Sequence, residues 1–303
     1  MMETKNIITD LNYSILKVDT TEKEVRALLR AARRAVFFAH LSKRKIEKKA
    51  WLVQIAQCLQ SLDDYEHSEK YLKKALRLQH DDPLALLALA EVMRTCYCER
   101  EEESLNLCTA VIKENPYYAP SYYFRGLCFY EMQYFEEAIE DFSEAIRLKP
   151  EWAAPYCARG TSYTEIIKDN PDYEEDEAQE MIEQGFADFE KALELLPSYA
   201  LVYFNRGSTY DDFDEYENAC SDYLNAIRCG GGDYADAYFN LGCTYRKEYK
   251  NVAAVDAFTD AIKLKKNYYA AYYNRGNAYD DLGEVRKALN DYNKVIGISR
   301  KKK

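Results

Sequence analysis

Aromatic and small residues recur along this chain with a period near 34, most plainly between residues 115 and 150. The spacing of three or four residues within each half of the period predicts two short helices per unit. Counting Ala119 as position 1, the recurring positions are 4, 8, 11, 20, 24, 27 and 32, which hold Tyr122, Gly126, Phe129, Ala138, Phe142, Ala145 and Pro150. Because proline has no backbone N–H, Pro150 predicts the end of the second helix.

The size of the side chains at these positions predicts how the two helices pack. Glycine at position 8 and alanine at position 20 allow a close approach where the helices cross, and the aromatic residues fill the space around the crossing. The set returns in four later units and, in weaker form, in two earlier ones. We therefore expect one array over residues 49–303, with units near 49–82, 85–118, 119–152, 153–199, 200–234, 235–268 and 269–303.

The residues before the first unit divide into two parts. Residues 1–20 are mixed in character, and we expect them to be loosely ordered. Residues 21–48 predict a basic amphipathic helix, in which Thr21 has the N-cap position and Glu24 the spacing of a capping box. We expect this leading helix to pack on the first repeat. Binding to a membrane surface or to an acidic partner is the alternative.

The unit over residues 153–199 is longer than the others by 13 residues. The insertion falls between its two helices, and residues 165–183 hold nine Asp or Glu and one Lys. Asn170 and Pro171 predict a turn, and residues 174–183 predict an acidic extension of the second helix. A solvated protrusion is one interpretation, and a docking site for a basic partner is the other.

The period and this set of residues resemble the tetratricopeptide repeat family over roughly residues 49–300. Segments such as YFNRG and YYNRGNAYDDLG carry the resemblance, although position 7, usually apolar in the family, is arginine in four units. The resemblance implies an all-α fold, an α-solenoid of about seven helix–turn–helix repeats forming a right-handed superhelix. It also implies that the first helices line a concave groove in which such proteins bind peptides.

Composition narrows the class of partner. The chain has 303 residues and a net charge of −11, although residues 1–50 carry 12 Lys or Arg against 6 Asp or Glu. The acidic array argues against nucleic-acid binding, which requires basic residues along the phosphates. No apolar run approaches the roughly 18 residues that span a membrane. The nine cysteines have irregular spacing, so we expect reduced, buried thiols in a cytoplasmic protein.

The sequence contains no recognisable catalytic or metal-binding motif. It has neither a glycine-rich phosphate loop nor a nucleophile near a base, and its three histidines lie far from any cysteine cluster. We therefore expect a non-catalytic protein without a metal or another cofactor.

A face of the first helices other than the packing stripe predicts the binding surface. Position 5 is aromatic in four of the five strong units, and an aromatic that is not needed for packing indicates a ligand surface. Position 6 is asparagine in the last three units, and an amide can bridge a peptide N–H and C=O. A local hydrogen bond between helices is the alternative role of these asparagines. The predicted peptide-binding residues are Tyr123, Phe124, Leu127, Tyr130, Phe204, Asn205, Asp211, Phe239, Asn240, Arg246, Tyr273, Asn274 and Asn277.

Two functional hypotheses follow. In the first, the chain is a protein–protein interaction scaffold that binds a peptide segment of another protein in the groove, mainly over residues 200–300. In the second, it is a regulatory or assembly subunit that acts through the acidic insertion or the N-terminal helix. Self-association through the C-terminal repeat is a further alternative, because no additional helix is expected to cover that unit. The basic clamp by which some family members bind chaperone C-termini is absent in every register.

Overall fold

The computed structural model describes residues 22–41, 45–96, 100–169, 175–232 and 234–301. Within these ranges the chain forms fifteen helices and no strand, which confirms the all-α prediction. The helices are α3 (Glu22–Leu41), α4 (Lys45–Gln60), α5 (Tyr65–Leu76), α6 (Pro83–Cys96), α7 (Glu101–Glu114), α8 (Ala119–Glu131), α9 (Phe135–Leu148), α10 (Ala153–Asp169), α11 (Glu175–Leu195), α12 (Ala200–Asp212), α13 (Tyr216–Cys229), α14 (Ala235–Lys247), α15 (Asn251–Leu264), α16 (Tyr269–Asp281) and α17 (Val285–Lys301).

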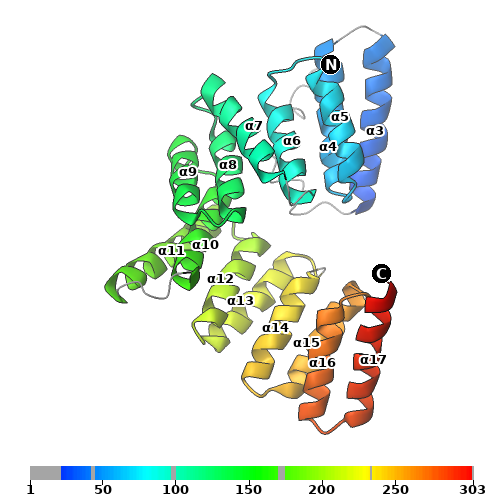
Figure 1. Cartoon of the computed structure of the whole chain (residues 1–303), viewed down its shortest axis with the longest axis vertical. Coiled ribbons are helices and arrows are strands. Elements are labelled where there is room, and N and C mark those ends of the chain that lie inside the picture. The colour runs from blue at the N-terminus through cyan, green and yellow to red at the C-terminus, as the bar shows by residue number, and fades with distance from the viewer. Residues whose placement is uncertain (1–21, 42–44, 97–99, 170–174, 233, 302–303) are drawn as a thin grey trace. The chain divides into compact units, whose positions relative to one another are not determined.

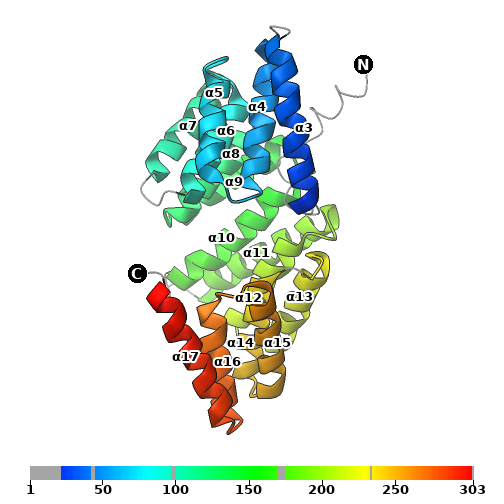
Figure 2. The same cartoon turned by 90° about the vertical axis from the view of Figure 1, so that its right-hand side faces the viewer.

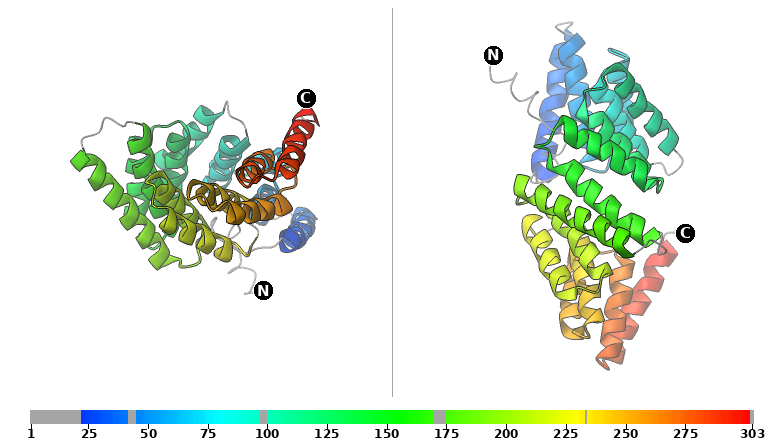
Figure 3. Two further views of the ribbon diagram at one scale, coloured as in Figure 1. Left: turned by 90° about the horizontal axis from the view of Figure 1, so that it is seen from below. Right: turned by 90° about the vertical axis from the view of Figure 1, so that its left-hand side faces the viewer.

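The chain divides into two compact units, residues 1–188 and residues 189–303. In the N-terminal unit α3 precedes the hairpins α4–α5, α6–α7 and α8–α9, and α10 follows them, with α11 crossing the boundary at Asp188 (Figure 1). The C-terminal unit holds the hairpins α12–α13, α14–α15 and α16–α17 (Figure 2). Within each unit the first helices of consecutive hairpins also contact one another, so they share one face (Figure 3).

The turn within a hairpin requires a backbone conformation that few residues favour. Position 15 of the repeat has a positive φ in five hairpins, at Asp63, Gln133, Asp214, Tyr249 and Gly283. Aspartate and glycine tolerate this left-handed region, whereas a bulky side chain is strained there. Gln133 and Tyr249 are therefore the two strained residues of the five, and Tyr249, with a φ of 59°, has the bulkier side chain.

The predicted leading helix is shorter than expected. The structure places α3 over Glu22–Leu41 and begins α4 at Lys45, so the single helix predicted over 21–48 is wrong. Val25, Leu29 and Ala32 of α3 are buried against Ile55 and Leu59 of α4, which supports packing on the first hairpin. The predicted Thr21 cap and residues 1–20 lie outside the described residues.

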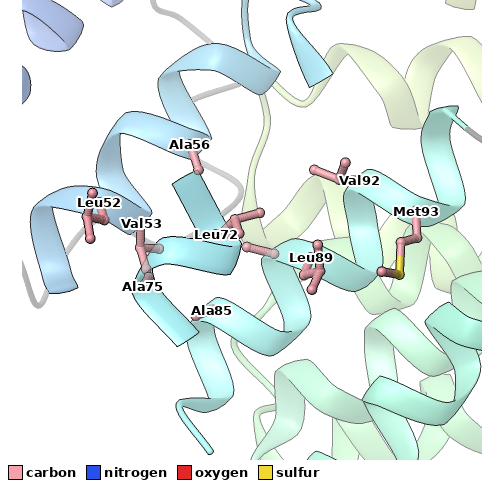
Figure 4. Packing of buried hydrophobic residues seen from close by; sticks show 10 residues of the cluster. Leu52, Val53, Ala56, Leu72, Ala75, Ala85, Leu89, Val92 and Met93 are labelled. Carbon is pink, nitrogen blue, oxygen red and sulfur yellow. The ribbon is translucent and has the colours of Figure 1, made fainter. Parts of the chain in front are cut away.

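Small residues at the helix crossings confirm the predicted packing. A Cβ atom added to Gly242 would lie 2.7 Å from the Phe258 ring, and one added to Gly276 would lie 2.6 Å from the Tyr292 ring. These rings stand at position 24, as predicted. The first hairpin uses aliphatic residues instead, and Figure 4 shows Val53, Ala56 and Leu72 in its core.

The acidic insertion lies on helices α10 and α11. The predicted turn at Asn170–Pro171 lies outside the described residues. The first turns of α11 expose carboxylates to solvent, at Asp176, Glu177, Glu180 and Glu183.

Candidate protein-interaction surface

A buried ion pair joins the two helices of four hairpins. In each, the arginine at position 7 donates two hydrogen bonds to the aspartate at position 23, as Arg206 does to Asp222 at 2.7 and 2.9 Å. We call these pairs the Arg–Asp braces; they are Arg125–Asp141, Arg159–Asp188, Arg206–Asp222 and Arg275–Asp291. The aspartates are buried, and burial raises the pKa of Asp141 and Asp188 against the opposing effect of their arginines.

The aromatic residues at positions 4 and 11 flank the arginine of the brace. The Arg206 guanidinium carbon lies 5.8 Å from the Tyr203 ring centroid and 6.0 Å from that of Tyr210. Arg275 has the same relation to Tyr272 and Tyr279, at 5.5 and 5.9 Å. A cation over an aromatic face is favourable at such distances. The braces thus give many of the 28 tyrosines a structural role.

Position 23 was missed by the sequence reasoning, although the sequence carries a signal for it. Aspartate stands at this position in the four units that have arginine at position 7. In the hairpin α14–α15 both members change together, to Leu241 and Ala257, which are buried in one apolar cluster. Position 7 is therefore a packing position in every strong unit.

Three of the four aromatic residues at position 5 pack between hairpins, so for Tyr123, Phe204 and Phe239 the expectation that packing does not need them is wrong. The Phe204 ring stacks on Tyr234 with centroids 5.1 Å apart, and Phe239 lies 5.0 Å from Tyr268. Tyr123 lies 4.7 Å from Trp152 in the same way. Each partner ring directly precedes the first helix of the following hairpin.

The predicted peptide-binding residues on α8 are largely covered by neighbouring helices. Phe124 is only 4% exposed and packs with Leu87 and Val111, so its side chain is not available on the predicted binding surface. Leu127 is half-buried against the same cluster. The Tyr130 ring lies 5.4 Å from Phe135, and burial raises its pKa to about 12. The helical period places these residues off the main stripe but does not show which neighbour covers them.

One of the asparagines at position 6, Asn274, forms internal hydrogen bonds. Asn240 of α14 is half-buried. The Asn274 amide nitrogen donates to the Ala270 carbonyl at 3.0 Å, and its oxygen accepts from Arg246. Asn205 occupies the same place on α12 and is half-buried. The local role considered for these residues is therefore present in the structure for Asn274.

Polar contacts link the first helices of the C-terminal unit in sequence. Asp211 of α12 accepts hydrogen bonds from Thr244 at 2.9 Å and from Lys247 at 2.7 Å, both on α14. Arg246 of α14 lies 3.3 Å from the Asn274 oxygen and 3.5 Å from the Asp281 carboxylate, both on α16. We call these two sets of contacts the polar rungs.

Two predicted residues on α16 differ from the rest. Asn277 accepts a hydrogen bond from the Tyr292 hydroxyl at 3.0 Å, within the hairpin. Tyr273 is 52% exposed, and its ring contacts Tyr292 at 6.0 Å. The structure therefore brings Asp211, Arg246 and Asn274 into the polar rungs and leaves Tyr273 open to solvent.

Other kinds of site find no support in the part of the chain that the structure describes. Over those residues, no three or more His, Cys, Asp or Glu side chains are grouped to hold a metal ion. None of the described helices combines the length and apolar character needed to cross a membrane. Eight cysteines among the described residues are free thiols, and five of them are buried.

Comparisons with known proteins identify the repeat. Models of the tetratricopeptide repeat match residues 52–82, 119–152, 200–228, 235–268 and 269–301, which together exceed half of the chain. Serine/threonine-protein phosphatase 5 of Mus musculus is 40% identical over 85 residues, 28% of this chain and 17% of that protein. DnaJ homolog subfamily C member 7 of Homo sapiens is 24% identical over 204 residues, 67% of this chain and 35% of that protein. The chain thus spans a minor part of these relatives.

Solved structures share the fold. Yeast Tom70 has a TM-score of 0.63 at 17% identity, over 93% of this chain and 57% of that one. The Cut9–Hcn1 hetero-tetramer of the APC/C also gives 0.63, at 16% identity over 99% of this chain and 64% of that one. Identities this low show the all-α repeat fold and nothing of the partners.

Proposed function

The chain belongs to the tetratricopeptide repeat family, and from this premise we propose that it is a non-catalytic scaffold that binds a peptide segment of another protein. Proteins of this family generally mediate protein–protein interactions. We place the peptide in a groove along the first helices α12, α14 and α16.

The polar rungs are the observation that carries this proposal. Their charged members are partly exposed, as Lys247 and Asp281 show. Ion pairs at such sites contribute only about 0–1 kcal/mol each, so a peptide N–H or C=O can replace one partner at little cost. The exposed Tyr273 ring would add apolar contact beside them.

The double variant Asn205→Ala, Asn240→Ala tests the groove. Affinity capture from the native cell with the wild-type chain identifies the partner, and binding is then measured with its purified peptide segment. Losing two neutral hydrogen bonds should weaken binding about tenfold or more. Helicity, measured by circular dichroism, should not change.

A control variant separates binding from stability. Asn218→Ala, Asn290→Ala removes the same amides from exposed sites on the second helices α13 and α17. This variant should bind as the wild-type chain does. Equal binding by the Asn205, Asn240 variant would refute the groove.

The exposed carboxylates at the start of α11 support a second candidate, a subunit that docks a basic partner there. Replacing Glu177, Glu180 and Glu183 by lysine would remove that partner and leave groove binding intact. Retention of every captured protein by this variant would exclude the second candidate.

A further inference from the structure

The outer face of α17 contains apolar positions that other hairpins bury. Position 28 is 8% exposed at Ile227 and at Ile262, where the next first helix covers it, but Ile296 of α17 is 51% exposed. Position 21 is 8% exposed at Cys220 and 56% exposed at Leu289. Within the C-terminal unit, the surface that receives a helix in the earlier hairpins is therefore exposed at α17, the outermost helix of that unit (Figure 2).

Position 5 shows the same relation. The rings of Phe204 and Phe239 each contact the aromatic residue that precedes the next first helix. Tyr273, at the same place in α16, is half exposed and has only its own hairpin's Tyr292 as a ring contact among the described residues. We call Tyr273, Leu289 and Ile296 the end face.

The earlier hairpins show what kind of helix fits this surface. The incoming helix begins after an aromatic residue, Tyr234 or Tyr268, whose ring contacts the aromatic residue at position 5. Its third residue is an alanine, Ala237 or Ala271, which is fully buried. A small side chain there lets the helix approach closely. These two features define how a helix that docks on the end face would be aligned along it.

The charge of the end face distinguishes between two helices that could both fit it, one from a second copy of this chain and one from another protein. Residues 285–297 of α17 expose Arg286, Lys287 and Lys294, whereas Asp291 is buried in its brace with Arg275. A second copy of the chain would bring like charges together through α17 itself. It would also do so through α3, which exposes four arginines. Like-charge juxtaposition opposes association, and acidic residues on the incoming helix favour it.

The last turn of a docked helix would lie near the first turn of α17, so a charge in that last turn would affect binding. In the hairpin α14–α15 the Lys247 ammonium lies 5.5 Å from the Tyr216 ring of α13. Tyr216 has the repeat position that Val285 has in α17, next to Arg286. An acidic residue at the place of Lys247 would therefore lie near Val285, in the same first turn of α17 as the exposed Arg286.

We propose that the end face docks an amphipathic helix of another protein, one with an aromatic residue before its first turn, a small third residue and an acidic last turn. This surface goes beyond the proposed groove, because Leu289 and Ile296 lie on α17 and not on the first helices. Variants at these two residues therefore test it separately.

The probe is a labelled peptide with the sequence of residues 268–282, which has Tyr268, Ala271 and Asp281 at the three places. Its binding to the full chain is measured by fluorescence anisotropy. A photoreactive residue in place of Tyr268 should label the α16–α17 segment. Asp281→Lys in the peptide should weaken binding about threefold or more at low salt, and this difference should shrink at high salt.

Leu289→Glu and Ile296→Glu in the chain should each weaken peptide binding about tenfold or more, because a carboxylate replaces an apolar contact. Val252→Glu is the matched control, since Val252 is exposed on α15 away from α17, and it should bind normally. No saturable binding, or binding unaffected by Leu289→Glu, would overturn the proposal. A concentration-dependent dimer in sedimentation, lost in Ile296→Glu, would overturn it in favour of a second copy.

Discussion

Arg206 on α12 donates two hydrogen bonds to the carboxylate of Asp222 on α13, at 2.7 and 2.9 Å, and the aspartate is almost fully buried. The next hairpin has Leu241 and Ala257 at the same two positions. The same pair of positions between two helices is therefore an ion pair in one hairpin of this chain and a pair of apolar residues in the next. A buried ion pair is often no more stabilising than well-packed apolar residues, but breaking it leaves an unpaired charge.

Arg206→Leu and Asp222→Ala should therefore be strongly coupled. Each single change should lower the free energy of unfolding by about 3 kcal/mol or more. The double variant, which copies the hairpin α14–α15, should recover most of that loss. Urea unfolding followed by circular dichroism measures all four species, and additive losses in the double variant would contradict the expectation.

Gly242→Ala should destabilise the hairpin α14–α15. The new methyl group would lie 2.7 Å from the Phe258 ring, and overpacking of this kind costs about 1–3 kcal/mol. Gly297→Ala on α17 is the control, because a Cβ there meets nothing within 4 Å. It should stabilise its helix by up to about 1 kcal/mol. Thermal melting of the two variants should shift in opposite directions.

Tyr249→Gly should raise stability. Tyr249 is 89% exposed and has a φ of 59°, a conformation that costs a bulky residue about 1–2 kcal/mol. Glycine removes that strain at an entropic cost of about 0.5–1 kcal/mol, so the net gain should be small but measurable. Tyr134→Gly, in an equivalent turn with a φ of −91°, offers no strain to relieve. A gain in that variant too would show that strain is not the cause.

Cys220 and Cys243 should react slowly with iodoacetamide in the native protein. Burial raises the pKa of both thiols to about 12, and the nearby Glu248 carboxylate adds to the effect at Cys220. Only the thiolate reacts, so the rate should keep rising above pH 9, where an ordinary thiol with a pKa of about 8.5 levels off. Peptide mass spectrometry reports each site, and urea-unfolded protein supplies the ordinary profile. A native profile that levels off near pH 9 would contradict the raised pKa values.

The contacts of the predicted binding residues could not be predicted from the sequence, because the partners lie far apart along the chain. Helical spacing identified position 5 as a separate face, but the partner of Phe204 is Tyr234, thirty residues later and in another hairpin. The same limit applies to Asn274, whose side-chain oxygen accepts a hydrogen bond from Arg246 in the preceding hairpin. Phe124 was misplaced because periodicity within α8 contains no information about the helices α6 and α7 that cover it.

By itself, the sequence determined the repeat and its crossing, because a glycine at position 8 opposite an aromatic at position 24 is a local size pattern that recurs every 34 residues. It also determined the family, through the same pattern. Only the tertiary structure decided which polar and aromatic side chains are used internally. That outcome depends on contacts between helices, which partly bury Phe204 against Tyr234, pair Arg206 with Asp222 and leave Tyr273, Leu289 and Ile296 exposed.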